Sequence, residues 1–193
     1  PGFNGGISIM SELRTNRIIP RDGLASGVSG GIIQVVSATK TTSQSITSLS
    51  GNNWSDVSNC SPVITPTRSD SKILIMYNIG GGLADMNGHN FWYRIHRSIS
   101  GGSSGAVAVS TDSANSVYTT GGFNFYRVDV DADTMFLNAM SGTFLDSPAT
   151  TSACTYKFQV TSSDTNSTIY INRRGANSNN TGTSTITLME VSG

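Results

Sequence analysis

The sequence predicts an all-β fold, an antiparallel jelly-roll-like β-sandwich of about eight to ten strands with an extended N-terminal arm. Its apolar runs are about four to nine residues long, rich in Val, Ile, Tyr and Phe, and bounded by Ser, Thr, Gly or Asn rather than by helix caps. No stretch sustains a period near 3.6 residues, and only residues 10–17 resemble a short helix. The Cys, Trp, Cys signature of an immunoglobulin sandwich is missing, which favours a jelly roll.

Ten strands are expected along the chain, because short β-rich runs alternate with clusters of turn residues. The expected strands are residues 32–39, 43–49, 63–65, 71–79, 90–99, 123–130, 136–144, 153–161, 168–172 and 183–191. Breakers rich in Gly, Ser and Asn separate them at residues 51–53, 80–82, 101–105, 121–122 and 178–182. This spacing is typical of two antiparallel sheets packed face to face.

Two of the expected strands differ in how their apolar residues are distributed. Residues 155–160 alternate cleanly between apolar and polar side chains, which predicts one face on the core and one in water. In residues 71–79, by contrast, Leu74 and Met76 add apolar side chains to the face opposite the isoleucines. A strand that is apolar on both sides is either central in a two-layer fold or lies at a subunit contact. We predict that Leu74 and Met76 lie at a homo-oligomer interface.

Composition excludes several classes of partner. Twelve basic residues balance twelve acidic ones, so no nucleic-acid partner is expected. The longest apolar runs fall far short of the ~20 residues that a membrane helix requires, so no membrane insertion is expected. Cys60 and Cys154 are too few for a disulfide scaffold and are interpreted as small buried thiols, although a single bridge between them is left open.

One sequence string resembles a hydrolase motif. Residues 101–105 form G-x-S-x-G around Ser103, which in hydrolases marks a nucleophile between a strand and a helix. No helical pattern follows here. His89 and His96 both precede the serine, whereas that fold requires the histidine to follow it. We expect no catalysis by Ser103.

A second string resembles the start of a calcium loop. Asp129, Asp131 and Asp133 form D-x-D-x-D, but the sixth and twelfth positions hold Thr134 and Met140 where a calcium loop needs Gly and Glu. An exposed strand edge is the preferred interpretation, and a cation site is the alternative.

The remaining candidates for chemistry are isolated side chains. His89, His96 and Asp85 are weak evidence for zinc, and Asp85 and Asp112 are the only loop carboxylates worth naming as a glycosidase pair. A carbohydrate depolymerase is therefore kept only as a third hypothesis. We expect no enzyme, no catalytic residue, no cofactor and no metal.

One strand face has the composition of a binding surface. In a strand over residues 90–99, Trp92, Arg94 and His96 share a face, and an outer face of this kind can stack on sugar rings or anchor a protein contact. The alternative is ordinary packing, with His96 a hydrogen-bonded surface histidine.

The chain resembles a module of tail-fibre and other virion proteins of marine tailed phages, especially cyanophages. The resemblance rests on the order of SELRTNRIIPRDGL, GGIIQVV, SATKTT, SKILIMYNIG, FLDSPATTSACTYKFQV, STIYINRRGAN and TSTITLMEVSG, and covers most of the chain from about Ser11. It implies a virion component assembled in the bacterial host cytoplasm, a C-terminal jelly-roll-like domain, trimers and no catalytic residue. The chain is shorter than a full fibre and lacks heptads and a β-helical shaft.

The expected organisation is an arm at residues 1–31 and a β domain at residues 32–193. Arg14, Arg17 and Arg21 in the arm are expected to pair with acidic groups of other phage virion proteins. The first hypothesis is a trimeric tail-fibre or appendage protein whose loops contact host-surface glycan or protein. The alternative is a capsid decoration, or cement, protein on the phage head.

Overall fold

The structure is a computed structural model and describes residues 31–50, 53–84, 90–110, 119–124, 137–163, 165–166, 168–175 and 179–193. Within these ranges the regular structure is all β, and no helix is long and apolar enough to cross a membrane. Twelve strands are described: β1 Ile32–Lys40, β2 Gln44–Ile46, β3 Ser55–Asp56, β4 Val63–Ile64, β5 Lys72–Ala84, β6 Asn90–Ile99, β7 Ser104–Val107, β8 Gly121–Asn124, β9 Asn138–Asp146, β10 Cys154–Ser162, β11 Thr168–Ile171 and β12 Ser184–Val191.

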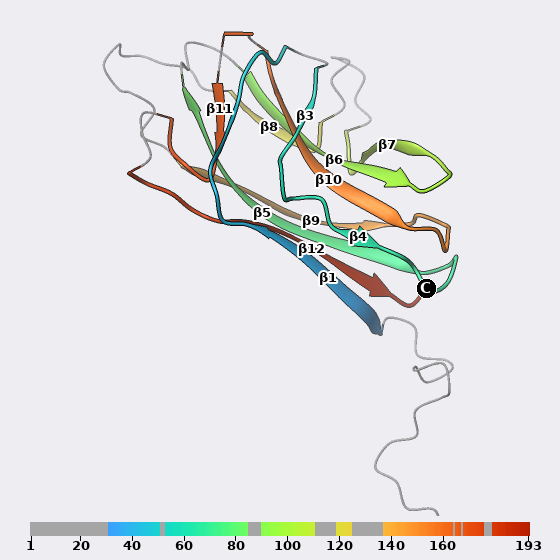
Figure 1. The fold of residues 1–193 in the computed structure, drawn as a ribbon. Helices are drawn as coiled ribbons and strands as arrows, with labels where there is room; N and C mark the ends of the chain where they lie inside the picture. Colours follow the sequence, from blue (N-terminus) through green and yellow to red (C-terminus); the bar gives the residue numbers. More distant parts are fainter. Residues whose placement is uncertain are drawn as a thin grey trace, which may run out of the picture.

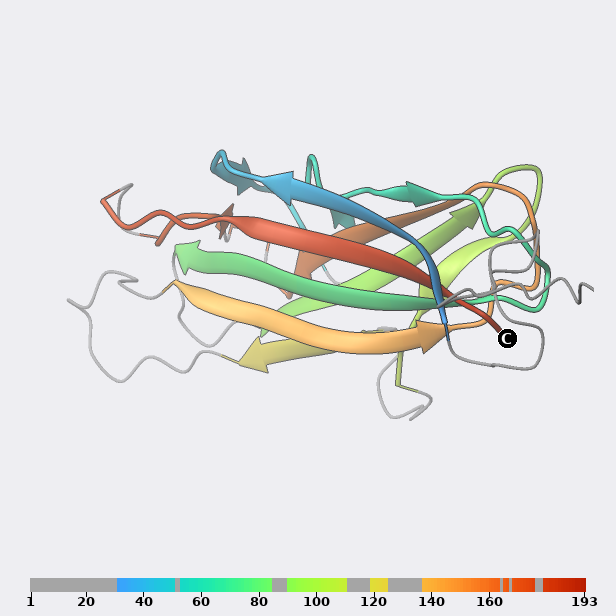
Figure 2. The same ribbon diagram turned by 90° about the horizontal axis from the view of Figure 1, so that it is seen from below.

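The strands form two antiparallel sheets packed as layers (Figure 1). Sheet A runs β9–β5–β12–β1, and β11 and β2 extend it along the far end of β5. Sheet B runs from β3 and β4 through β10 and β6 to β7 and β8. Figure 2 shows the four long strands of sheet A side by side, with sheet B behind them. The first and last strands pair, and strands distant in sequence interleave in both sheets, which is the order of a jelly roll. The predicted jelly-roll-like β-sandwich is confirmed, and residues 1–30 of the expected arm lie outside the described residues.

Alternate side chains of the central strands point between the sheets and form the core. The ring of Tyr93 on β6 stacks on Phe158 of β10, with centroids 5.3 Å apart, and Tyr77 of β5 packs on Phe158 at 5.5 Å. Burying side chains of this size contributes about 1.5–3 kcal/mol each. The core is completed by Ile46, Leu49, Val57, Cys60, Ile64, Ile73, Ile75, Ile79, Phe91, Ile95, Met140, Cys154, Tyr156, Val160, Ile169, Ile171, Ile186 and Leu188.

Asp146, at the end of β9, ties sheet A to sheet B. Its Oδ2 accepts hydrogen bonds from Arg97 Nη1 at 2.6 Å and from the Tyr156 hydroxyl at 2.7 Å. Arg97 lies on β6 and Tyr156 on β10, so one carboxylate holds two strands of the opposite sheet. Burial and the neighbouring carboxylate raise the pKa of Tyr156, so its hydroxyl stays a donor.

Glu190, on the inner face of β12, is fully buried and forms no ion pair within the described residues. Its Oε1 accepts from the backbone nitrogen and the hydroxyl of Thr67, both at 2.7 Å, and its Oε2 accepts from Gln34 Nε2 at 2.6 Å. Burial alone would raise the pKa of Glu190, but donation from Gln34 and Thr67 outweighs it and lowers the pKa. The carboxylate therefore joins β1 and β12 to the segment between β4 and β5.

Several predicted boundaries were wrong. A break was expected at residues 80–82, but β5 continues to Ala84 because Gly81 pairs with β11. A side chain at Gly81 would come within 2.7 Å of Met140 Cε, so glycine permits close packing here instead of ending the strand. A loop was expected at residues 101–105, but β7 begins at Ser104 and forms a hairpin with β6. Gly101, with a φ of 70°, occupies the left-handed region in that turn.

Other boundaries shifted without changing the topology. The strand expected at 123–130 is described as β8, Gly121–Asn124, and residues 125–130 lie outside the described residues. Strand β3 was not predicted. The described chain thus has twelve strands, above the eight to ten expected.

Cys60 and Cys154 are both buried and both free, as buried thiols were expected to be. The disulfide that the sequence left open is not formed. Burial raises the pKa of Cys60 to about 11 and also raises the pKa of Cys154, which keeps both as thiols.

Candidate functional site

Four apolar side chains cross the outer face of sheet A in one row. Leu145 on β9 pairs with Leu74 on β5, Leu74 with Met189 on β12, and Met189 with Val35 on β1. Leu145 is 51% exposed and Val35 is 54% exposed. We call these four residues the apolar row. A contiguous apolar surface of this kind on a folded domain is typical of an interaction site.

The next two rows on this face carry no charged side chain. Hydroxyl groups pair across the strands, with Ser37 Oγ and Thr187 Oγ1 3.1 Å apart. The rows consist of Thr143, Met76, Thr187 and Ser37, followed by Ser141, Asn78, Thr185 and Thr39. Together with the apolar row they form three uncharged rows across four strands of sheet A. Lys72, two residues before Leu74 on the same face of β5, borders them and donates to Ser147 Oγ at 2.9 Å.

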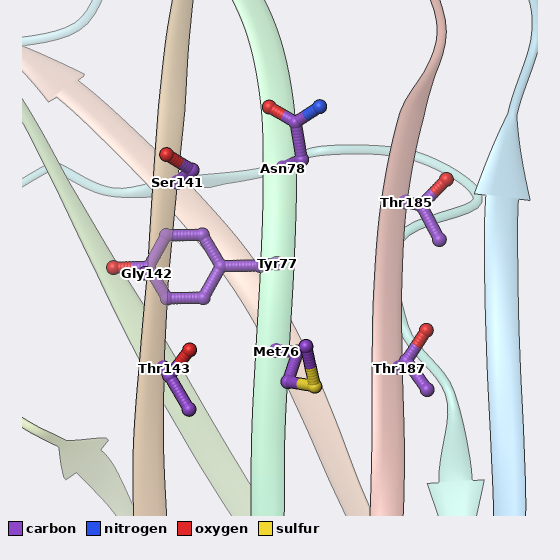
Figure 3. A pocket seen from close by; sticks show the side chains of 8 residues that line it. All are labelled: Met76, Tyr77, Asn78, Ser141, Gly142, Thr143, Thr185 and Thr187. Atoms are coloured by element: carbon purple, nitrogen blue, oxygen red, sulfur yellow. The ribbon is translucent and has the colours of Figure 1, made fainter.

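Part of this face is hollowed (Figure 3). The hollow has a volume of about 400 Å³, and Met76 projects into it between the hydroxyl-bearing side chains of β9 and β12. The ring of Tyr77 lies across β9 at Gly142, which has no side chain to obstruct it. Side chains of a partner have room here.

Leu74 and Met76 lie on the outer face of β5, as the alternation predicted. Met76 is 42% exposed, and Leu74 is half-buried in the apolar row. That these two residues contact a second subunit stays a prediction.

Trp92, Arg94 and His96 share the outer face of β6, as their spacing predicted. The register places Arg94 beside Gln159 of β10 and Gln159 beside Asp56 of β3, so one polar row crosses three strands. The face is partly exposed along this row. That it binds a ligand stays a prediction.

A chain of polar contacts fixes the side chains in this row. Arg94 Nε donates to Gln159 Oε1 at 2.8 Å, and Gln159 Nε2 donates to Asp56 Oδ1 at 2.6 Å. Lys157 Nζ donates to Asp56 Oδ2 at 2.7 Å. The Arg94 guanidinium lies over the Trp54 ring, 4.2 Å from its centroid. We call Trp54, Asp56, Arg94, Lys157 and Gln159 the Trp54–Arg94 platform.

The platform carries two cationic side chains, Arg94 and Lys157, and one anionic side chain, Asp56. Burial would raise the pKa of Asp56, but donation from Lys157 and Gln159 outweighs it and lowers the pKa. Burial lowers the pKa of Arg94. For His96, burial and the charge of Arg94 lower the pKa, which favours the neutral imidazole at pH 7.

His96 itself makes only one weak polar contact among the described residues. Its Nε2 lies 3.4 Å from Ser104 Oγ, and its Nδ1 is buried without a partner. The imidazole therefore lies at the margin of the platform and takes no part in its hydrogen bonds.

Sequence patterns missed Trp54, Asp56, Lys157 and Gln159 as members of this surface. Strand β3 is only two residues long, too short to leave a periodic signal. Lys157 and Gln159 occupy the polar face of a strand that was predicted correctly, but only the register shows that Gln159 is the neighbour of Arg94.

The remaining predicted site residues that the structure describes form no catalytic or metal site. Ser103 lies in the β6–β7 hairpin and is followed by a strand, so the strand-turn-helix geometry of the hydrolase motif is not formed. No three His, Cys, Asp or Glu residues in the described ranges cluster as a metal centre requires. The predicted residues outside the described ranges are Arg14, Arg17, Arg21, Asp85, His89, Asp112, Asp129, Asp131 and Asp133.

No protein-family model matches the chain, and no curated protein sequence is significantly similar to it. Among solved structures it is similar to the infectious bursal disease virus Gx strain structure, with a TM-score of 0.45 and 11% identity over 93% of this chain and 46% of that chain. The Gt strain structure gives 0.44 and 13% identity over 93% and 44%. The VP2 subviral particle of that virus gives 0.42 and 13% identity over 93% and 46%. The chain spans less than half of each, and no function follows from this likeness.

Proposed function

We propose that the chain is a structural protein of a phage particle, a trimeric tail-fibre or appendage protein, and that it self-associates through the outer face of sheet A. The apolar row is the observation that carries the self-association, and the resemblance to virion proteins supports the place in a phage particle. Leu145 and Val35 are each more than half exposed, and the two rows beside them carry no charge. Burying these three rows against another copy removes apolar area from water without desolvating a charge within them, and Lys72 lies at their border.

A closed cyclic assembly suits this surface. In a three-fold assembly each subunit would bury its apolar row once, and the assembly would carry three copies of any ligand site on sheet B. Repetition of a weak site raises the effective affinity for a surface that carries many copies of the ligand. The jelly roll also occurs in viral capsid and lectin domains, which is support by analogy of fold only.

The self-association is tested with the double variant L74S/M76S. We expect the wild-type chain to be an oligomer and the variant a monomer by light scattering, because two apolar side chains of this face become polar. Val63, which is 49% exposed on β4 of sheet B, provides the matched control V63S, which keeps the oligomer. An unchanged oligomer in L74S/M76S contradicts the proposal.

The place in the particle is tested by gold-labelled antibody on intact phage. Label at the tail supports a fibre or appendage protein. Label spaced evenly over the head identifies a decoration protein instead, and no label on the particle contradicts a virion role.

A further inference from the structure

The Trp54–Arg94 platform lies on sheet B, opposite the surface assigned to self-association. Its members come from three adjacent strands, β3, β10 and β6, or directly precede one of them. Neighbouring strands lie about 4.8 Å apart, so the row from Asp56 through Gln159 to Arg94 spans about 10 Å. A surface this long accommodates more than one ring of a polymeric ligand.

Arg94 is the group on the platform with unused hydrogen-bonding capacity. Its Nε donates to Gln159, but no described residue accepts a hydrogen bond from its Nη1 or Nη2. The carboxylate of Asp56 is already taken by Lys157 and Gln159. The guanidinium therefore lies over Trp54 with its terminal nitrogens available, and this fork matches a carboxylate or a sulfate.

The platform also offers an aromatic surface next to the cation. Trp92 precedes Arg94 by two residues on the same face of β6 and is half-buried. The Trp92 indole packs against Gly122 of β8. A Cβ atom at position 122 would lie 2.6 Å from Trp92 Cδ1, so the lack of a side chain at Gly122 makes room for the indole. Aromatic rings with a polar neighbour suit ligands that have one apolar and one polar side. Sugar rings have this character.

We infer that the Trp54–Arg94 platform binds acidic saccharides, with the carboxylate or sulfate of the sugar on the Nη atoms of Arg94 and a sugar ring against Trp92. Lys157 lies on the same face and adds a second cation beside this row, while the hydrogen bonds of Lys157 and Gln159 hold Asp56 in place. This ligand class deepens the proposed function, because a saccharide on a cell surface is a ligand that a phage appendage encounters. The binding test uses the isolated protein, so it succeeds or fails independently of particle location and of self-association.

The test measures binding of the full chain to three oligosaccharides of equal length by calorimetry. The probes are a mannuronic acid oligomer, a sulfated dextran oligomer and an uncharged dextran oligomer. We expect at least one acidic oligomer to bind at least tenfold more tightly than the uncharged one, and to weaken as salt is raised. Comparison of the two acidic probes identifies the preferred anion. Equal binding of the uncharged oligomer, or no binding of any probe, overturns the inference.

Two variants locate the site. R94Q removes the charge, and R94K keeps the charge but loses the planar fork, so both are expected to weaken acidic binding at least tenfold. The control is R68Q, which removes an arginine that is 62% exposed in a surface ion pair with Asp70. Circular dichroism confirms that each variant is folded, and W54A provides a second disruption of the platform if R94Q does not fold. Equal binding by R94Q and R68Q overturns the assignment.

Discussion

Leu145 and Asp146 are consecutive residues of β9 that face opposite sides of sheet A. Leu145 is 51% exposed in the apolar row, whereas Asp146 is 7% exposed and bonds to Arg97 and Tyr156 of sheet B. The neighbouring row, on the inner face of sheet A, contains two acidic residues, Asp146 and Glu190. Both pair with Ile73 of β5. The proposed subunit surface is backed directly by Asp146, whose hydrogen bonds join the two sheets.

Replacing Asp146 with alanine should destabilise the domain by about 3–5 kcal/mol, because Arg97 is left with a partly buried, unpaired charge. The measurement is the free energy of unfolding in urea. The control is D70A, since the Arg68–Asp70 pair is exposed and its loss should change the free energy of unfolding far less. A D146A variant as stable as D70A would show that the contact between the sheets is not stabilising.

Glu190 should make stability depend on pH. Its pKa is lower in the folded state than its ordinary value of 4.5, so the folded state releases the proton more readily than the unfolded chain. The stabilisation is complete above about pH 5 and is lost as the pH falls through 4.5 and then through the folded pKa. E190Q should lose about 1–3 kcal/mol at pH 7 and show a flatter decline of unfolding free energy from pH 5 to pH 3. Parallel curves of unfolding free energy against pH for E190Q and the wild-type protein would contradict this role of Glu190.

Gly142 should not tolerate a side chain. A Cβ there would come within 2.7 Å of Tyr77 Cζ, and Tyr77 cannot move freely because its ring packs on Tyr93 and Phe158. G142A should therefore lower the free energy of unfolding by about 1–3 kcal/mol. A Cβ atom at Gly105 on β7 would have no other atom within 4 Å. G105A is therefore the matched control and should melt near the wild-type temperature.

The two thiols should be unreactive in the folded protein. Cys60 and Cys154 are buried, and burial raises the pKa of both, so little thiolate is exposed to reagent at pH 8. Ellman's reagent should detect almost no thiol in the native protein and two per chain in guanidinium. Rapid release of colour from the native protein would mean that one cysteine is accessible, and C60S and C154S would then identify it.

The period-two alternation predicted the fold class and most central strands, because it reports which side chains face the core. Strand β6 was predicted with its observed bounds, and the shared face of Trp92 and Arg94 followed from it. Alternation also placed Leu74 on the outer face of β5. These features depend only on the order of side chains within one strand.

Pairing between distant strands was not predictable from the same pattern. The apolar row needs the register of β1 with β12, and the platform needs Asp56, from a strand of two residues, beside Gln159. Gly81 was taken for a break because glycine ends many strands, whereas the pairing of Gly81 with Ile171 of β11 continues this one. Composition gave no sign that Glu190 would be buried, since its partners Gln34 and Thr67 are far from it in sequence.

The late position of β10 and β12 in the chain affects how the domain folds during its synthesis. Strand β12 lies between β1 and β5, and β10 lies between β3 and β6, so neither sheet can close until the last strands have left the ribosome. Until then the edges of β1 and β5 are open to neighbouring nascent chains. Slow translation or crowded polysomes should therefore increase aggregation of this protein more than that of a domain built from sequential hairpins.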